Sequence, residues 1–149
     1  MPVVMDIDKA PVETFPDGRG KRVRLFDPSN FTKNIDLHIN ILYPGQPAKG
    51  DIHYHKTMEN IYIILEGEGK IFNSKGEEFP VKAGQVVLFR PGEPPDDHEP
   101  YNTGSEPLRF IEIYAPPHPR EAYLEMNGGQ SKRDSVFVKK LESGRIKNS

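Results

Sequence analysis

The sequence contains no cysteine, and this absence removes several kinds of site at once. Disulfide bonds, thiolate metal centres and cysteine nucleophiles are all excluded. Any metal bound by this chain must therefore be held by nitrogen and oxygen. With 149 residues, the chain is long enough for one domain with a core and tails, and too short for two comfortable domains.

Long apolar runs and clustered basic charge are missing as well. No stretch approaches the roughly 20 apolar residues of a membrane helix, and residues 1–8 lack the basic and apolar segments of a secretory signal. We therefore expect a soluble, cytoplasmic protein without a membrane partner. The 20 Lys and Arg residues are scattered among 22 Asp and Glu, for a net charge of -2, so no nucleic-acid partner is expected either.

Proline and glycine are abundant, with 15 and 13 residues, and they interrupt every long segment. This punctuation favours short strands over helices. Strands are expected at residues 21–26, 35–42, 61–65, 85–90 and 108–114, with a hairpin around residues 74–76. Short strands between regular turn signals are typical of an all-β sandwich or barrel. Farther along, residues 120–126 suit one or two helical turns, and residues 134–142 suit a strand or a helix.

Residues 35–42 alternate cleanly between apolar and polar side chains. Asp36, His38 and Asn40 share one face of the expected strand. We expect that polar face to meet solvent, because antiparallel sheets commonly keep one face wet. The alternative is that these residues form the polar wall of a cavity.

The segment 50–70 carries the strongest chemical signal. His53 and His55 stand two residues apart, so their side chains point the same way on an extended chain. Glu59 and Asn60 follow, ahead of an apolar run that glycines close. Two imidazoles on one face, with an oxygen-bearing side chain close behind, suit a metal ion.

Two motifs resemble those of the cupin superfamily, the small jelly-roll barrels. The first, a glycine followed by His-x-His, an acid and a second glycine, falls on Gly45, His53, His55, Glu59 or Asn60, and Gly67. The second, a glycine, Pro-x-Gly, a histidine and an asparagine, falls on Gly84, Pro91, Gly92, His98 and Asn102. The resemblance implies an all-β fold, a single jelly-roll (double-stranded β-helix) barrel over residues 21–117. An N-terminal arm (1–20) and a C-terminal extension (118–149) flank it.

The acid of the first motif is displaced by one residue. Counting six residues back from Gly67 reaches Asn60, whereas the acid, Glu59, stands one position earlier. A one-residue slip on a strand turns a side chain to the opposite face. Glu59 therefore points away from the metal if Asn60 begins a regular strand, unless a bulge or the preceding turn brings it back. Both residues stay open as a fourth ligand.

The resemblance implies that His53, His55 and His98 converge on one divalent metal ion, Fe, Mn, Ni or Zn. An amide in the fourth position leaves the metal more cationic than a carboxylate does, which favours a polar, anionic chelating substrate. Such a centre suits chemistry of the dioxygenase, lyase or isomerase type.

Other side chains are candidates for contact with the substrate. Tyr62 and Tyr101 carry hydroxyls that can orient a substrate or donate a proton. Arg90 and Arg109 can clamp a carboxylate, and Arg90 stands at a strand end near the loop of His98.

Two classes of function remain open. The first is a metal-dependent enzyme, and the second is a non-catalytic module that captures a small, sugar-like ligand. Cupin-like domains of this size commonly pair sheet edges and exchange N-terminal arms, so the resemblance also implies a homodimer. His38 and His118 match neither motif and are assigned structural roles. The substrate, the metal and the role of the C-terminal extension stay open.

Overall fold

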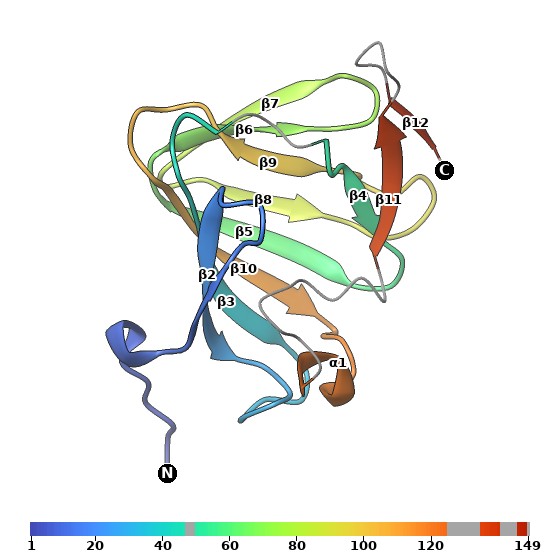
Figure 1. The fold of residues 1–149 in the computed structure, drawn as a ribbon. Coiled ribbons are helices and arrows are strands. Elements are labelled where there is room, and N and C mark those ends of the chain that lie inside the picture. Colours follow the sequence, from blue (N-terminus) through green and yellow to red (C-terminus); the bar gives the residue numbers. More distant parts are fainter. Residues whose placement is uncertain (47–49, 125–134, 141–145, 149) are drawn as a thin grey trace.

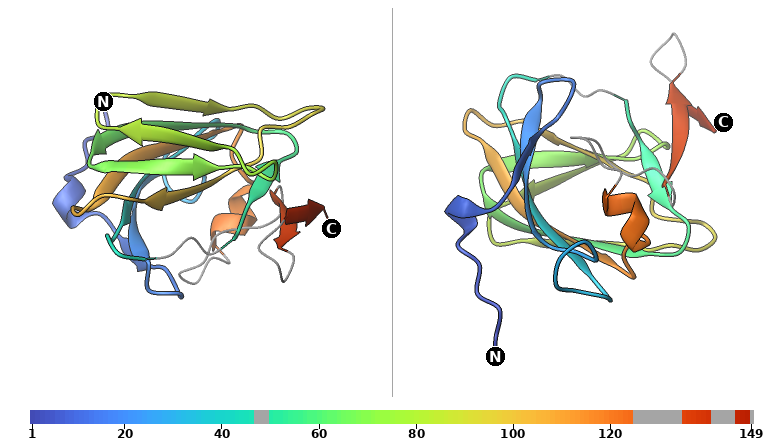
Figure 2. Two further views of the ribbon diagram at one scale, coloured as in Figure 1. Left: turned by 90° about the horizontal axis from the view of Figure 1, so that it is seen from above. Right: turned by 60° about the horizontal axis from the view of Figure 1, so that its bottom comes forward.

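Two facing sheets form a barrel in the computed structural model, which describes residues 1–46, 50–124, 135–140 and 146–148 (Figure 1 and Figure 2). The larger sheet has the strand order β1-β2-β3-β10-β5-β8, the smaller has the order β7-β6-β9, and β4 lies in a further sheet ordered β12-β11-β4. The predicted all-β jelly roll is confirmed.

The predicted strands all form, and shorter ones complete the barrel. The larger sheet contains β1 (Val12–Thr14), β2 (Gly20–Phe26), β3 (Asp36–Leu42), β5 (Glu59–Glu66), β8 (Val86–Phe89) and β10 (Leu108–Ala115). The others are β4 (His53–His55), β6 (Glu68–Phe72), β7 (Glu78–Lys82), β9 (Glu99–Asn102), β11 (Ser135–Lys140) and β12 (Ile146–Asn148). The expected hairpin around residues 74–76 joins β6 to β7.

An apolar core fills one part of the space between the two sheets. It contains Leu42, Tyr62, Ile64, Ile71, Val81, Phe89, Leu108 and Phe110. Gly67, between β5 and β6, has a φ of 83°. A Cβ atom there would come within 2.5 Å of the backbone oxygen of Pro107, so glycine is required by both conformation and space.

The polar face of β3 lies inside the barrel, and the expectation that it meets solvent is wrong. Asp36, His38 and Asn40 are each at most 5% exposed. The apolar face of β3 points outward instead, where the N-terminal arm covers it. The outer cluster contains Ala10, Val23, Leu25 and Ile39. The strand therefore has two covered faces, and the polar one must find its partners within the barrel.

The N-terminal arm lies against the outer face of the larger sheet. It contains a short 3₁₀ turn, η1 (Ile7–Lys9), and the edge strand β1, in which Val12 pairs with Val23 of β2. Residues 1–4 are exposed, and Figure 1 shows the N-terminus extending away from the barrel.

The C-terminal extension places a short helix, α1 (Arg120–Leu124), and the strand β11 next to the barrel. Residues 135–140 form a strand, so the strand alternative is correct for them, while residues 125, 126, 134, 141 and 142 lie outside the described residues. In β11, Ser135 pairs with His55 and Phe137 with His53. No helix in the described part of the chain has the length and apolar character that a bilayer crossing requires.

Candidate metal centre

Three histidines meet inside the barrel. His53 and His55 come from β4, where their spacing of two puts both side chains on one face. Their nearest partner, His98, precedes β9 and exchanges backbone hydrogen bonds with His53 at 3.0 and 2.8 Å. One ligand atom of each histidine lies within 4.8 Å of the other two, and all three residues are buried.

Backbone carbonyls fix the orientation of two of these rings. Nδ1 of His53 lies 2.9 Å from the carbonyl oxygen of Asp51, and Nδ1 of His98 lies 2.9 Å from that of Asp96. Because a carbonyl oxygen only accepts, both Nδ1 atoms carry the proton and each Nε2 presents its lone pair. Nε2 of His98 is buried and has no hydrogen-bond partner among the described residues.

The electrostatic surroundings favour neutral imidazoles, which is the form that binds metals. Burial lowers the pKa of His53 below its ordinary value. Burial, and then the neighbouring His53 and His55, holds the pKa of His98 well below its ordinary value. His53 and His98 are therefore neutral donors, and a set of imidazoles suits an ion such as Zn²⁺, Fe²⁺, Mn²⁺ or Ni²⁺.

At the ambiguous position, Asn60 faces the interior and Glu59 does not. Asn60 is 0% exposed, whereas Glu59 is exposed to solvent. The pairing of β5 with β10 is regular here, with Asn60 opposite Tyr114 and Glu59 opposite Ala115, so no bulge turns Glu59 inward. Oδ1 of Asn60 is buried and has no hydrogen-bond partner within the described chain.

A second buried polar cluster lies on the inner face of the larger sheet, and we call it the charge network. It consists of Arg22, Asp36, His38, Asn40 and Glu112, each of them buried. His38 bridges two acids, with Nδ1 at 2.8 Å from Asp36 Oδ1 and Nε2 at 2.7 Å from Glu112 Oε1. The sequence offered a polar cavity wall of Asp36, His38 and Asn40 as the alternative to a solvated face, but their partners Arg22 and Glu112 were missed. The signal that could have found them is the matching polar alternation of residues 22, 36, 38, 40 and 112.

Aromatic rings connect the apolar core to the histidines. Phe89 stacks on His98, with ring centroids 3.6 Å apart and planes 16° apart. Tyr62 is 2% exposed, and its ring centroid lies 6.1 Å from that of His98. Burial, and then the charge of Glu112, raises the pKa of Tyr62 well above its ordinary value, so its hydroxyl stays protonated.

The structure does not bring the other candidate side chains to the histidines. Tyr101 stacks on Phe72 with centroids 4.4 Å apart, and Arg109 pairs with Glu66 at 3.3 Å. His38 and His118, which were assigned structural roles, both have ring contacts with Tyr114, whose ring also contacts that of His55.

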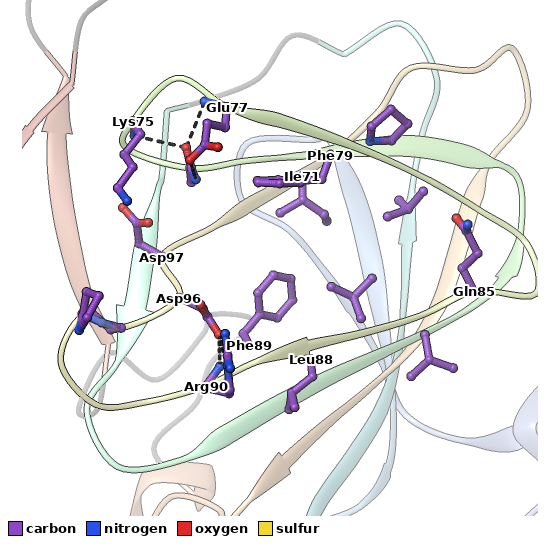
Figure 3. Close-up of a pocket in the computed structure, with 17 residues that line it drawn as sticks. Ile71, Lys75, Glu77, Phe79, Gln85, Leu88, Phe89, Arg90, Asp96 and Asp97 are labelled. Carbon is purple, nitrogen blue, oxygen red and sulfur yellow. Dashed lines mark hydrogen bonds and ion pairs between the residues drawn. The ribbon is translucent and has the colours of Figure 1, made fainter.

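Arg90 lines a separate cleft of about 660 Å³ between the β6–β7 hairpin and β8 (Figure 3). Its Nε donates to Asp96 Oδ2 at 2.9 Å, and its side chain is 71% exposed. None of the three histidines is among the described residues that line this cleft. Phe89 and Asp96 line this cleft and also contact His98.

Comparisons with known proteins agree with this fold. The chain is 39% identical over 72 residues to the oxalate-binding protein of Thermotoga maritima, covering 48% of this chain and 54% of that protein. The chain spans about half the length of the curated relatives it matches.

Two solved structures show the same barrel. A predicted oxalate decarboxylase from Thermotoga maritima matches with a TM-score of 0.65 and 26% identity, over 77% of this chain and 100% of that one. A sugar phosphate isomerase of the cupin superfamily from Silicibacter pomeroyi matches with a TM-score of 0.67 and 17% identity, over 99% of this chain and 93% of that one, which shows a shared fold.

The family model for the cupin domain matches residues 40–114, which include β4, all three clustered histidines and Asn60. The matched range also contains both glycine-bounded motifs, and it leaves out the N-terminal arm and the C-terminal extension. The chain therefore belongs to the cupin family.

Proposed function

We propose that this chain binds one divalent metal ion through His53, His55 and His98 and acts on a small, polar, anionic molecule that chelates the metal. The observation that carries the proposal is the buried triangle of imidazoles, in which the lone pair of His98 Nε2 has no partner within the described chain. A buried nitrogen acceptor is normally satisfied, so this geometry suits a cation.

Asn60 is the proposed fourth ligand, in preference to Glu59. Its buried Oδ1 is an unpartnered oxygen on the interior face, whereas Glu59 points to solvent. Four neutral donors leave the full charge of the ion available to an anionic substrate in a dry cavity. When bound, the metal supplies a Lewis acid for a chelated oxygen, and iron would add the capacity for oxygen chemistry.

The chain itself contributes orientation and exclusion of water. The backbone carbonyls of Asp51 and Asp96 hold two imidazoles in place, and the stacked ring of Phe89 covers one face of His98. The ring centroid of Tyr62 lies 6.1 Å from that of His98, and its protonated hydroxyl is the candidate donor to a substrate oxygen.

Oxalate is the first substrate to test. Its two carboxylates can chelate one metal ion, and the relative from Thermotoga maritima that shares 39% identity is an oxalate-binding protein. The dioxygenase, lyase and isomerase classes remain the alternatives for the reaction. A phosphosugar is the second substrate to test, because the chain is 32% identical over 91 residues to a glucose-6-phosphate isomerase of Pyrococcus abyssi.

Metal analysis tests the proposal. Protein purified without chelator, or reconstituted with Zn²⁺, Mn²⁺, Fe²⁺ or Ni²⁺, is expected to hold one ion per chain and to bind oxalate only in the loaded form, by titration calorimetry. The matched control is His118→Ala, which removes a buried histidine outside the cluster and should keep the ion. If the protein holds no stoichiometric metal after reconstitution, the proposal fails.

A non-catalytic binding module is the second candidate function. It is favoured by the acid-base properties of the site. Charge and hydrogen bonds hold the pKa of Glu112 well below its ordinary range despite burial, while the pKa of Tyr62 is raised, so neither exchanges protons readily near neutral pH. Metal-dependent binding of oxalate or a sugar with no change in the recovered ligand would support this candidate over the enzyme.

We also propose a homodimer. Phe79, Val86 and Leu88 are 48%, 66% and 47% exposed beside the cleft, and Val4 in the arm is 88% exposed. Exposed apolar edge strands and an exposed apolar arm suit mutual burial between two copies. Light scattering at micromolar concentration is expected to give twice the mass of the chain, and removal of residues 1–5 should weaken the dimer. A monomeric full chain would contradict this.

A further inference from the structure

We propose that Glu112 is a positioning residue for the candidate metal centre: it orients the side-chain amide of Asn60 so that Oδ1, and not Nδ2, faces the histidines. This inference rests on the proposed function, because it explains how the fourth position of the same centre is set. It also explains why that position holds an amide instead of an acid.

The hydrogen bonds of Asn60 define which way its amide points. Nδ2 donates to Glu112 Oε2 at 3.0 Å and to the backbone oxygen of Ile113 at 3.2 Å. A carboxylate and a carbonyl can only accept, so the atom between them must be the NH₂ group. Both of its hydrogens are used, and Oδ1 points the other way, buried and without a partner in the described chain.

The strand register places Asn60 among the residues that touch the histidines. On one side it is opposite Tyr114 of β10, whose ring centroid lies 5.2 Å from that of His55. On the other it is opposite Phe89 of β8, whose ring stacks on His98. Directly opposite residues point to the same face of a sheet, so Asn60 shares the interior face with both of these neighbours.

Glu112 is itself fixed by donors on its other oxygen. Oε1 accepts hydrogen bonds from His38 Nε2 and Asn40 Nδ2, both at 2.7 Å, and Arg22 Nη2 lies 3.9 Å away. Arg22 Nε donates in turn to Asn40 Oδ1 at 3.0 Å. With Oε1 held in this way, Oε2 has one orientation, and the only side chain bonded to it is that of Asn60 among the described residues.

The charge network keeps Glu112 ionised. Both ring nitrogens of His38 lie against carboxylate oxygens, so both carry protons and the ring is an imidazolium. His38 and Arg22 then balance Asp36 and Glu112 with two charges of each sign in a buried space. A carboxylate held this way accepts from Asn60 but cannot donate to it, so the reversed amide, with Oδ1 against Glu112, is disfavoured.

The same contact accounts for the amide at position 60. An acid there would set a second carboxylate beside Glu112, with oxygens about as close as the present contact of 3.0 Å. Two like charges at that distance cannot both stay ionised in a buried site. An asparagine offers the metal a similar oxygen while its NH₂ group satisfies Glu112.

A double-mutant cycle on metal affinity tests the inference. The affinity of wild type, Asn60→Ala, Glu112→Gln and the double variant for Zn²⁺ is measured by competition with a chelating dye. Each single variant is expected to lose roughly 10- to 100-fold, as for groups that orient a metal ligand. If Glu112 acts through Asn60, the double variant loses no more than Asn60→Ala alone. The inference is overturned if the affinity losses of the two single variants multiply in the double variant, or if Glu112→Gln loses no affinity.

Glu66→Gln is the matched control, because it makes the same chemical change as Glu112→Gln but at the end of β5 far from Asn60. There Glu66 pairs with Arg109 at the surface. It should leave the Zn²⁺ affinity unchanged. The visible spectrum of the Co²⁺ form adds a readout that general loosening of the barrel does not reproduce: the spectrum of Glu112→Gln should move to that of Asn60→Ala.

Wild-type protein provides a test that needs no folded variant of Glu112. In a ¹⁵N spectrum, the side-chain NH₂ signals of Asn60 are expected to shift when Zn²⁺ is added, together with the imidazole signals of the three histidines. Shifted imidazole signals with an unchanged Asn60 signal overturn the inference and the assignment of Asn60 as fourth ligand, and leave the proposed metal site of the three histidines intact. If no imidazole signal shifts, the proposed function itself fails.

Discussion

His98 and His38 are both buried inside the same barrel, yet their ring nitrogens have opposite surroundings. The two nitrogens of His38 face two ionised carboxylates, those of Asp36 and Glu112. His98 has one nitrogen on a backbone carbonyl, while its Nε2 has no partner in the described chain. The first ring is therefore charged and saturated, and the second is neutral and has a lone pair to give.

Burial alone therefore does not distinguish a structural histidine from a metal ligand. The two kinds of histidine differ in how many hydrogen-bond acceptors surround the ring. A buried imidazole that finds carboxylates on both sides is held as a cation and adds to the fold. One that finds a single carbonyl keeps a fixed tautomer, which is how metal-binding histidines are commonly oriented. Both kinds occur on the interior face of one jelly roll, and substitutions at the two positions should have different consequences.

Removal of His98 is expected to give the largest effect on metal binding. His98→Ala should lose more than roughly 100-fold in Zn²⁺ affinity, since even groups that only orient a ligand cost about 10- to 100-fold. His55→Ala should behave alike. Competition with a chelating dye measures this, and circular dichroism verifies the fold. If a variant that lacks His98 still binds Zn²⁺ as tightly as wild type, His98 is not a metal ligand.

Removal of His38 is expected to affect stability before metal binding. His38→Ala leaves Asp36 and Glu112 without their shared cation, and breaking a buried ion pair in this way costs about 3–5 kcal/mol. Urea unfolding measures the loss. The control is Lys70→Ala, which breaks the exposed ion pair with Glu78 and should leave the stability close to that of the wild type. Equal losses would contradict the buried-cation assignment.

The stability of the wild-type protein should fall as the pH rises into the alkaline range. Burial and the charge of Arg22 lower the pKa of His38, but Asp36 and Glu112 outweigh them and leave it above the ordinary value. A raised pKa in the folded state means that the stabilising charge is complete below the unfolded pKa of about 6.5 and is lost as the pH rises through the folded value.

Urea unfolding of the wild type and of His38→Gln between pH 6 and pH 9.5 measures this decline. The neighbouring tyrosine that bonds Asp36, Tyr123, keeps its proton over this range, since burial and then Asp36 raise its pKa. The variant should show a flatter profile. A wild-type profile no steeper than that of the variant would show that His38 is neutral.

The sequence was sufficient to predict the strands and the shared face of His53 and His55, because both depend on local spacing. The jelly-roll barrel and the convergence of His98 on that pair were implied by the resemblance to the cupin superfamily. Alternating residues define strands, and the His-x-His pair must share a face in any extended conformation. The displaced acid could be posed as a question of register from the sequence, and the regular pairing of Asn60 with Tyr114 answers where each side chain points.

The charge network could not be predicted with the same reasoning. Whether Asp36, His38 and Asn40 meet water depends on which face of β3 turns into the barrel, and the N-terminal arm covers the other, apolar face on the outside. Their partners Arg22 and Glu112 are 90 positions apart in the chain. Such long-range compensation of charge is a property of the assembled barrel, and the polar alternation of β3 is equally compatible with a solvated face.

The smallest effect is expected at the position where the family's acid would stand by sequence alone. Glu59 is exposed and lies opposite Ala115, on the face of β5 that points away from the histidines. Glu59→Ala should therefore change Zn²⁺ affinity by less than about threefold, the usual range for a surface substitution. Asn60→Ala, one residue along the same strand, is the matched comparison and should lose at least about 10-fold. An equal loss of metal in Glu59→Ala and His98→Ala would mean that Glu59 turns inward when the ion binds, and that the amide of Asn60 serves only Glu112.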